Sequence, residues 1–187
     1  MKTKDEIDKI KASLLYILVQ FPDGIDFIKL FKIMYFAEKE HLINYGRSIT
    51  RDSFHALKHG PVPSFTYKAI QVTQGKIKEN QDLNEVAMSI IISGDKIFAK
   101  TNADKDELSI SDMRCLDNAI NKCKSIDSYT LSDISHEDSA WKDAYSRSQD
   151  DPEKNKITLI DIARSGNASI DIINKIRESE LIKMAFS

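Results

Sequence analysis

The apolar residues of this chain recur with the period of an amphipathic α-helix over much of its length. Over residues 4–20 they follow one another at intervals of three and four positions, which places them on one face of a helix. From residue 27 to about residue 42, apolar side chains cover more than half of the helix circumference, a pattern typical of a helix at the centre of a core. Asp26 is suited to cap this second helix, and Gly46 to end it in a left-handed conformation.

Two segments depart from the helical period. Residues 86–101 hold two β-branched runs on either side of Ser93-Gly94-Asp95-Lys96, which predicts an antiparallel hairpin. In Gly60–Pro63, two prolines bracket a valine, and a helix interior does not tolerate them. We interpret this segment as a stiff loop, followed by a short helix that Ser64 caps and that runs from residue 65 to about residue 72.

The second half of the chain has helical periodicity again, with Ser135 as the predicted cap of the helix that carries Trp141. Further helices are predicted near residues 110–124, 135–145, 158–164 and 169–184. Ser146–Lys154 is polar and contains a proline, which indicates a linker. The predicted fold is mainly α (α+β), a single helical domain with a small antiparallel β-hairpin. It consists of a domain over residues 1–149 and a C-terminal helical extension over residues 150–187, packed on the same domain.

Composition narrows the class of protein. The 187 residues are 41% hydrophobic and 30% charged, the balance of a soluble globular domain. No apolar run approaches the ~20 residues of a membrane-spanning helix. The N-terminus lacks the continuous apolar core of a signal peptide, so we predict a cytoplasmic protein. Cys115 and Cys123 are eight positions apart on a predicted helix, about 12 Å by helical rise, so we expect both to be reduced.

The charge distribution argues against nucleic acid as the main ligand. Net charge is −2, with 11 Lys and Arg against 8 Asp and Glu in residues 1–75, and 16 against 21 in residues 76–187. A dedicated DNA-binding domain usually carries a clearly basic surface, which these counts do not indicate. The acidic second half is better suited to a basic partner.

The histidines raise the questions of metal binding and catalysis. His55 and His59 have the i, i+4 spacing of a ligand pair, but a Gly-Pro follows directly, and a third ligand would have to come from His41 or His136. His136 with Glu137 is a candidate acid–base pair, yet no nucleophile motif or phosphate-binding loop accompanies it. We therefore expect no metal, no cofactor, no catalytic residue and no enzymatic activity.

Two features have a structural and a functional interpretation. Trp141, the single tryptophan, is interpreted as a core anchor whose indole N–H is hydrogen-bonded, with an interface hot spot as the alternative. Gly60–Pro63 redirects the chain, and a rigid segment also presents a surface to a partner at little cost in entropy. Both interpretations of Gly60–Pro63 remain open at this point.

Three passages together resemble the Panacea domain family, which includes the SocA-like antitoxins. They are KIMYFAEKEHLINYGRSIT at Lys32–Thr50, FHALKHGPVP at Phe54–Pro63 and LSDISHEDSAW at Leu131–Trp141. Their order and spacing are similar to those of the family, and the resemblance spans residues 28–145. His59 is a departure, because a tyrosine is more usual before the Gly-Pro-Val.

The resemblance implies a mostly helical domain with a small β element. It also implies an antitoxin of a bacterial toxin–antitoxin system, which neutralises a protein toxin encoded nearby by direct protein–protein binding. Two alternatives are a DNA-binding transcriptional regulator and a protease adaptor that delivers the toxin for degradation. A protease is a further partner only in the adaptor alternative, and no membrane partner is expected.

We expect the shared passages to converge in space, with Tyr35, the Gly46-Arg47 turn, Gly60–Pro63 and the His136–Trp141 segment in one neighbourhood. Trp141 should then lie within about 20 Å of Gly60–Pro63, on the scale of a small domain. The candidate partner-binding residues are Arg47, Phe54, Gly60, Pro61, Val62, Pro63, Phe65, Tyr67, His136 and Trp141.

Overall fold

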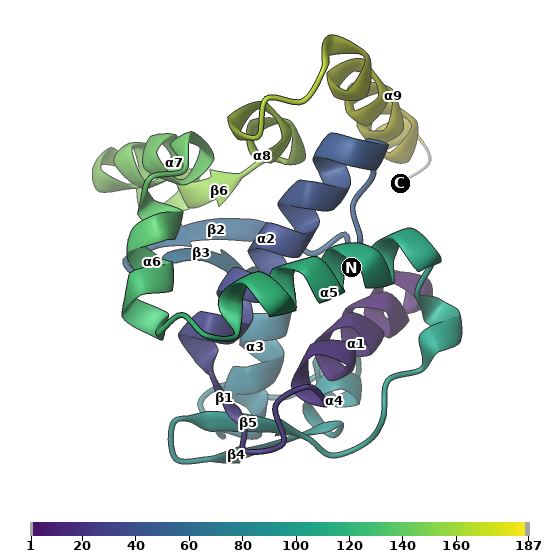
Figure 1. Ribbon diagram of the computed structural model, residues 1–187, viewed down its shortest axis with the longest axis vertical. Coiled ribbons are helices and arrows are strands. Elements are labelled where there is room, and N and C mark those ends of the chain that lie inside the picture. The colour runs from purple at the N-terminus through teal and green to yellow at the C-terminus, as the bar shows by residue number, and fades with distance from the viewer. Residues whose placement is uncertain (1, 186–187) are drawn as a thin grey trace.

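A largely buried helix, α2 (Phe27–Tyr45), passes through the centre of the computed structural model, which describes residues 2–185. The carboxylate of Asp26 accepts a hydrogen bond from the backbone N–H of Lys29, and Gly46 ends the helix with φ of 68°. Both helix ends were predicted. Helices α1 (Lys4–Leu18) and α5 (Ile110–Cys123) lie beside α2 (Figure 1).

One three-stranded antiparallel sheet has the order β1-β5-β4. Its strands are β1 (Ile25–Asp26), β4 (Ile90–Ser93) and β5 (Lys96–Ala99). The β4–β5 hairpin confirms the predicted hairpin, but its first strand begins at Ile90 rather than at residue 86. Residues 86 and 87 belong to α4 (Gln81–Ala87), which Asn80 caps and which buries Leu83 and Val86. A β-branched run is therefore helical where a cap and a buried face favour the helix.

The second three-stranded sheet, of order β3-β2-β6, was not predicted. Its strands are β2 (Phe54–Leu57), β3 (Gly60–Pro63) and β6 (Lys156–Ile157). Interpreting Gly60–Pro63 as a loop was therefore wrong, because the segment is a buried strand paired with β2. Proline lacks an N–H, but an edge strand tolerates it because one side of the strand needs no ladder hydrogen bonds.

The remaining elements correct two predicted caps and a predicted linker. The helices are α3 (Ser64–Thr73), α6 (Ser128–His136), α7 (Ser139–Asp150), α8 (Leu159–Ser165) and α9 (Ile170–Ala185), with 3-10 turns η1 (Lys105–Glu107) and η2 (Pro152–Asn155). Ser64 makes no capping bond, since the N–H groups of Phe65 and Thr66 in α3 donate to Asp52. Ser135 lies inside α6, and Asp138 caps α7. The predicted linker at residues 146–154 is the end of α7 followed by η2.

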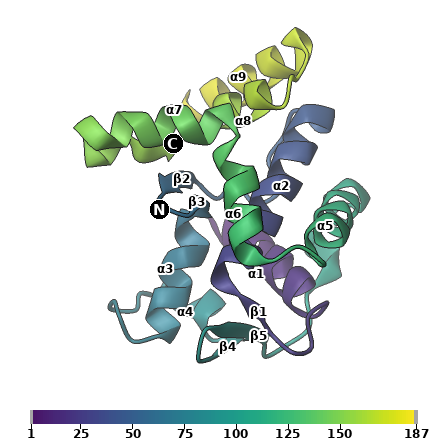
Figure 2. The same cartoon turned by 60° about the vertical axis from the view of Figure 1, so that its left-hand side comes forward.

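The chain after Asp150 returns to elements formed much earlier. Strand β6 pairs with β2, with Phe54 opposite Ile157. The ammonium group of Lys175 in α9 donates to the carbonyl oxygen of Tyr45 at 2.9 Å, next to the end of α2. Figure 2 shows α7, α8 and α9 at one end of the molecule and the β4–β5 hairpin at the other.

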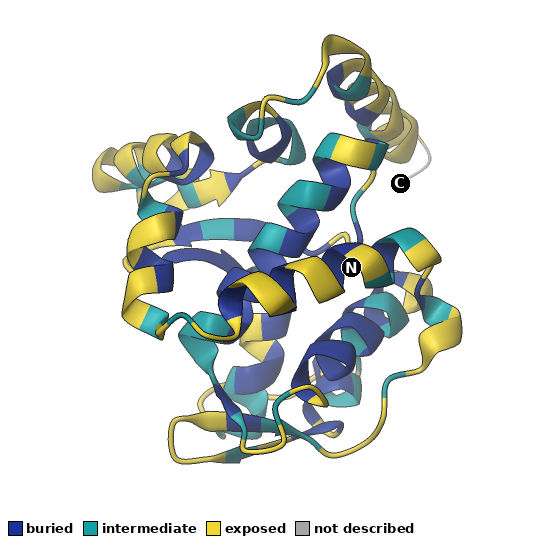
Figure 3. Ribbon diagram, in the orientation of Figure 1, coloured by how far each residue is buried: buried dark blue, intermediate teal, exposed yellow. Residues whose placement is uncertain are grey.

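The apolar side chains form two clusters. The larger joins α1, α2, α5, the first sheet and Val62 of β3, and the smaller joins β2 and β6 with α7, α8, α9 and other residues of α2. Figure 3 shows the buried residues along α1, α2, β2 and β3, and exposed ones on the outer faces of α5, α7 and α9. Within residues 2–185, none of the helices combines the length and the apolar content that spanning a bilayer requires.

Candidate partner-binding site around the β2–β3 hairpin

Three side chains from three different helices hold the backbone of the β2–β3 hairpin. The indole N–H of Trp141 in α7 donates to the carbonyl oxygen of Leu57 at 3.0 Å. The hydroxyl of Ser132 in α6 donates to the carbonyl oxygen of His59 at 3.1 Å. The ammonium group of Lys32 in α2 donates to the carbonyl oxygen of Pro61 at 3.2 Å. The turn therefore has a shape that the surrounding helices fix.

Gly60 is required where the hairpin meets α2 and α6. Its φ of 104° lies in the region that side chains rarely adopt. A Cβ atom at this position would lie 2.3 Å from the hydroxyl of Ser135 and 2.5 Å from Nζ of Lys32. Burial lowers the pKa of Lys32 to about 7, because the hydrophobic surroundings disfavour the ammonium form.

Trp141 occupies the middle of a stack of three rings. Its centroid lies 4.1 Å from that of His136 and 4.7 Å from that of Tyr145. Trp141 is buried and its N–H is hydrogen-bonded, as the core-anchor interpretation predicted. His136 belongs to α6 rather than to the helix of Trp141, and burial and the neighbouring Lys32 lower its pKa.

The exposed part of the hairpin is Leu57, at the end of β2, with the turn Lys58-His59 that follows it. All four residues of β3 are buried, and Phe54 is buried with its ring centroid 5.4 Å from that of Tyr35. The turn residues Lys58 and His59 are not among the predicted partner-binding residues. The signal for the turn was a polar Lys-His pair directly before Gly-Pro, flanked by apolar strands on both sides.

The predicted convergence of the three family passages is confirmed for some of their residues. Tyr35, the hairpin and the His136–Trp141 segment lie together, and the hydrogen bond from Trp141 to Leu57 places Trp141 next to the hairpin. Phe65 and Tyr67 lie on α3, directly after β3. Tyr67 is exposed, and its ring packs edge-on against Phe31 with centroids 5.9 Å apart.

Arg47 is the member that the structure places elsewhere. Its guanidinium lies 3.1 Å from the buried carboxylate of Asp112 at the start of α5, and it donates to the hydroxyls of Ser109 and Ser111. The expectation that Arg47 lies beside the hairpin is therefore wrong. An arginine binds a carboxylate and nearby hydroxyls at once, so this side chain joins the loop after α2 to α5.

A family model for the SocA-like antitoxin Panacea domain matches residues 30–142, more than half of the chain. The chain belongs to this antitoxin family. No curated protein and no solved structure matches it. The Panacea segment, residues 30–142, contains the β2–β3 hairpin and all three of its side-chain donors, Lys32, Ser132 and Trp141.

Buried acids fix the backbone of the Panacea segment at three further points, which the sequence analysis missed. Glu38 accepts hydrogen bonds from the N–H groups of Ile49 and Thr50 at 3.0 and 3.3 Å. Asp52 accepts from the N–H groups at the start of α3. Asp112 accepts from the N–H group of Ser109 at 3.0 Å and also pairs with the ammonium of Lys9 at 2.9 Å, in addition to Arg47. An acid within an apolar helical pattern, as at Glu38, was the available signal.

The four histidines of the chain have different surroundings. Nδ1 of His55 lies 2.8 Å from the amide oxygen of Asn155, and His59 is on the exposed turn. His41 is buried, with Nε2 3.0 Å from the carboxylate of Asp112, and His136 is in the ring stack. Within residues 2–185, no three His, Cys, Asp or Glu side chains are grouped to hold a metal ion.

Proposed function

We propose that this protein is an antitoxin that neutralises a co-encoded protein toxin by stable, stoichiometric binding, without catalytic turnover. The observation that carries the proposal is membership of the SocA-like antitoxin family over residues 30–142. The form of the hairpin supports it. A surface that is already rigid before binding loses little conformational entropy when a partner docks, so a clamped turn is well suited to binding.

We place the toxin contact at the exposed turn and the accessible side chains near it. Exposed Leu57 ends β2 and is followed by the turn Lys58-His59, with half-buried His136 beside them. Pro61 and Val62 are buried in β3, so we expect them to act by shaping the turn rather than by touching the partner. A Val62→Asp substitution would bury an unpaired charge and would therefore test folding rather than contact.

Co-expression with the product of the adjacent gene tests the proposal. Wild type should rescue growth and co-purify with that product in a fixed ratio. Leu57→Asp should reduce both rescue and co-purification, since a charge at an apolar contact must lose its hydration. Val19→Asp is the matched control, because Val19 is 41% exposed against 36% for Leu57 and lies on a different part of the surface, at the end of α1.

Direct neutralisation would be contradicted if the adjacent gene product is harmless. It would also be contradicted if growth is rescued without any complex between the two proteins. Rescue accompanied by protease-dependent loss of the toxin would favour the adaptor alternative. Rescue through reduced transcript of the operon would favour the regulator.

A further inference from the structure

An open groove of about 600 Å³ lies on the side of α2 that faces α5 and the α6–α7 junction. Its apolar lining comes from three helices, with Phe36 and Ile43 from α2, Ala119 from α5 and Ile134 from α6. Figure 1 shows these helices around α2. The groove is separate from the hairpin turn, although α6 borders both.

The floor of the groove is apolar and partly open to solvent. Phe36 packs against both hydrophobic clusters of the protein and so lies where the two meet. Ile134 is 41% exposed on the wall formed by α6. Ile43 packs closely on Gly166, where a Cβ would lie 2.1 Å from Cδ1 of Ile43. A close contact with half-buried Gly166 on one side and exposed apolar atoms on the other therefore border the floor.

The rim of the groove carries more negative than positive charge. The ammonium of Lys39 lies 2.7 Å from the carboxylate of Asp138, so these two charges compensate each other. Lys122 lies over the ring of Phe36, with Nζ 5.4 Å from the centroid. Glu40 and Glu137 are the two further carboxylates. Glu137 pairs with Lys142 at 2.8 Å on the surface, and such exposed pairs are easily replaced by a new cation.

Resting on the proposed function, we propose that this groove receives a short segment of the toxin with an apolar anchor and a flanking lysine or arginine. The anchor would lie between Phe36 and Ile134, and the cation would face Glu137. A groove of about 600 Å³ accommodates about one or two large apolar side chains. When a groove binds an amphipathic segment, apolar anchors provide affinity and charged groups set the orientation.

The charge of the groove lining favours a basic segment over an acidic one. Three carboxylates and two ammonium groups line the groove. The second half of the chain, residues 76–187, which includes the α5, α6 and α7 walls, holds 16 basic against 21 acidic residues. An acidic segment would meet net repulsion there, whereas a basic one would be attracted during approach and held after docking.

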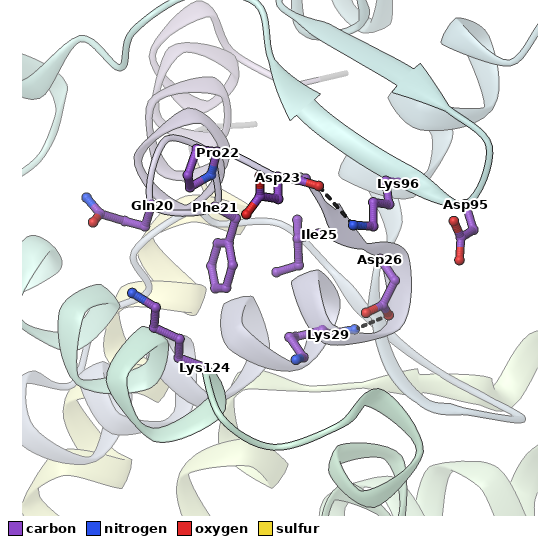
Figure 4. Close-up of a pocket in the computed structure, with 11 residues that line it drawn as sticks. Gln20, Phe21, Pro22, Asp23, Ile25, Asp26, Lys29, Asp95, Lys96 and Lys124 are labelled. Atoms are coloured by element: carbon purple, nitrogen blue, oxygen red, sulfur yellow. Dashed lines mark hydrogen bonds between the residues drawn. The ribbon is translucent and has the colours of Figure 1, made fainter.

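A second hollow, of about 550 Å³, does not give the same selection (Figure 4). Its charged lining residues are Lys29, Lys96, Lys124, Asp23, Asp26 and Asp95, which balance in number. Figure 4 shows Lys96 donating to the carbonyl oxygen of Asp23, and Asp26 capping α2. Most of this lining precedes residue 30, outside the Panacea segment.

Binding of the purified product of the adjacent gene to groove variants tests the proposal. Ile134→Asp should raise the dissociation constant at least about 30-fold, which corresponds to a loss of about 2 kcal/mol in binding free energy. The matched control is Ile91→Asp. Ile91 is 47% exposed on β4, at the opposite end of the molecule (Figure 2), and this variant should bind like wild type.

A charge reversal gives a second, independent measurement. Glu137→Lys should weaken binding about tenfold and reduce its dependence on salt, because it removes an attraction across the interface. Glu153→Lys, on the exposed turn η2, is its control and should leave binding unchanged. The Glu137 side chain is 81% exposed, so this variant decides the matter even if Ile134→Asp impairs folding.

The outcomes separate the two proposals. If wild type does not bind the adjacent gene product, the antitoxin proposal fails and the groove proposal fails with it. If wild type binds and neutralises, and both groove variants bind as tightly as their controls, the groove proposal alone is wrong. Amide hydrogen exchange should show protection of residues 118–122 and 134–139 on binding, and unchanged exchange there would also overturn it.

Discussion

The indole N–H of Trp141 donates a hydrogen bond to the carbonyl oxygen of Leu57 at 3.0 Å, across 84 positions of sequence. It joins the helix α7 to the end of β2, directly before the exposed turn. The same indole is stacked between His136 and Tyr145. One side chain therefore contributes both packing and a polar contact to the candidate site.

Trp141→Phe should separate these two contributions. Phenylalanine preserves most of the stack but lacks a donor, so we expect the free energy of unfolding to fall by about 1–2 kcal/mol in urea denaturation. Tyr145→Phe is the control, because it keeps the ring and removes only a hydroxyl, and it should change stability little. Equal stability of Trp141→Phe and wild type would mean that the hydrogen bond to Leu57 contributes nothing.

Asp112→Asn should lower stability by about 3 kcal/mol at neutral pH, because it leaves Lys9 and Arg47 without their carboxylate. Burial opposes ionisation of Asp112, but hydrogen bonds from His41 and Lys9 hold its pKa below the ordinary 3.8. The stabilisation is therefore present above about pH 4 and is lost as pH falls towards the lowered pKa.

Urea denaturation between pH 3 and pH 7 measures this difference. The gap between wild type and Asp112→Asn should shrink towards the acidic end. Asp133→Asn, at an exposed position of α6, should behave like wild type throughout. A constant gap at every pH would contradict the role assigned to the ionised carboxylate.

Lys32→Met should alter the pH dependence of stability in the alkaline range. The folded-state pKa of Lys32 is about 7 against an ordinary 10.5, so the unfolded chain binds more protons between these values. The stability of wild type relative to Lys32→Met should therefore rise from pH 7 to pH 10, by an amount on the order of a few kcal/mol. Lys68→Met, at an exposed lysine, is the control and should show no such trend.

Gly60→Ala should be far more destabilising than Gly94→Ala. Both glycines have positive φ, 104° and 62°, so both substitutions strain the backbone. Only at Gly60 would the new Cβ collide with Ser135 and Lys32, since the space around Gly94 is open. We expect a loss of about 1 kcal/mol for Gly94→Ala and several for Gly60→Ala. Thermal unfolding of the two variants side by side gives the comparison, and similar melting temperatures would refute it.

Local chemistry explains which parts of the fold were predictable. The cap at Asp26, the end of α2 at Gly46 and the turn between β4 and β5 each depend on residues a few positions apart. In the second sheet, the local β2–β3 hairpin was missed because its prolines indicated a loop, whereas β6 escaped prediction because it pairs with β2 about 100 positions earlier, through Phe54 and Ile157. No periodicity within a window of ten or twenty residues contains that pairing.

The candidate site also has features that the sequence predicted and features that only the structure showed. From the sequence, the resemblance of three passages indicated the family, and Trp141 was predicted as a buried, hydrogen-bonded anchor, because residue types and their spacing are local properties. Only the tertiary structure showed that β3 is buried, and that the carbonyl groups of Pro61 in β3 and of His59 in the turn accept hydrogen bonds from side chains of α2 and α6. It also placed Arg47 with Asp112 instead of at the hairpin, since long-range contacts depend on how helices pack and not on their individual patterns.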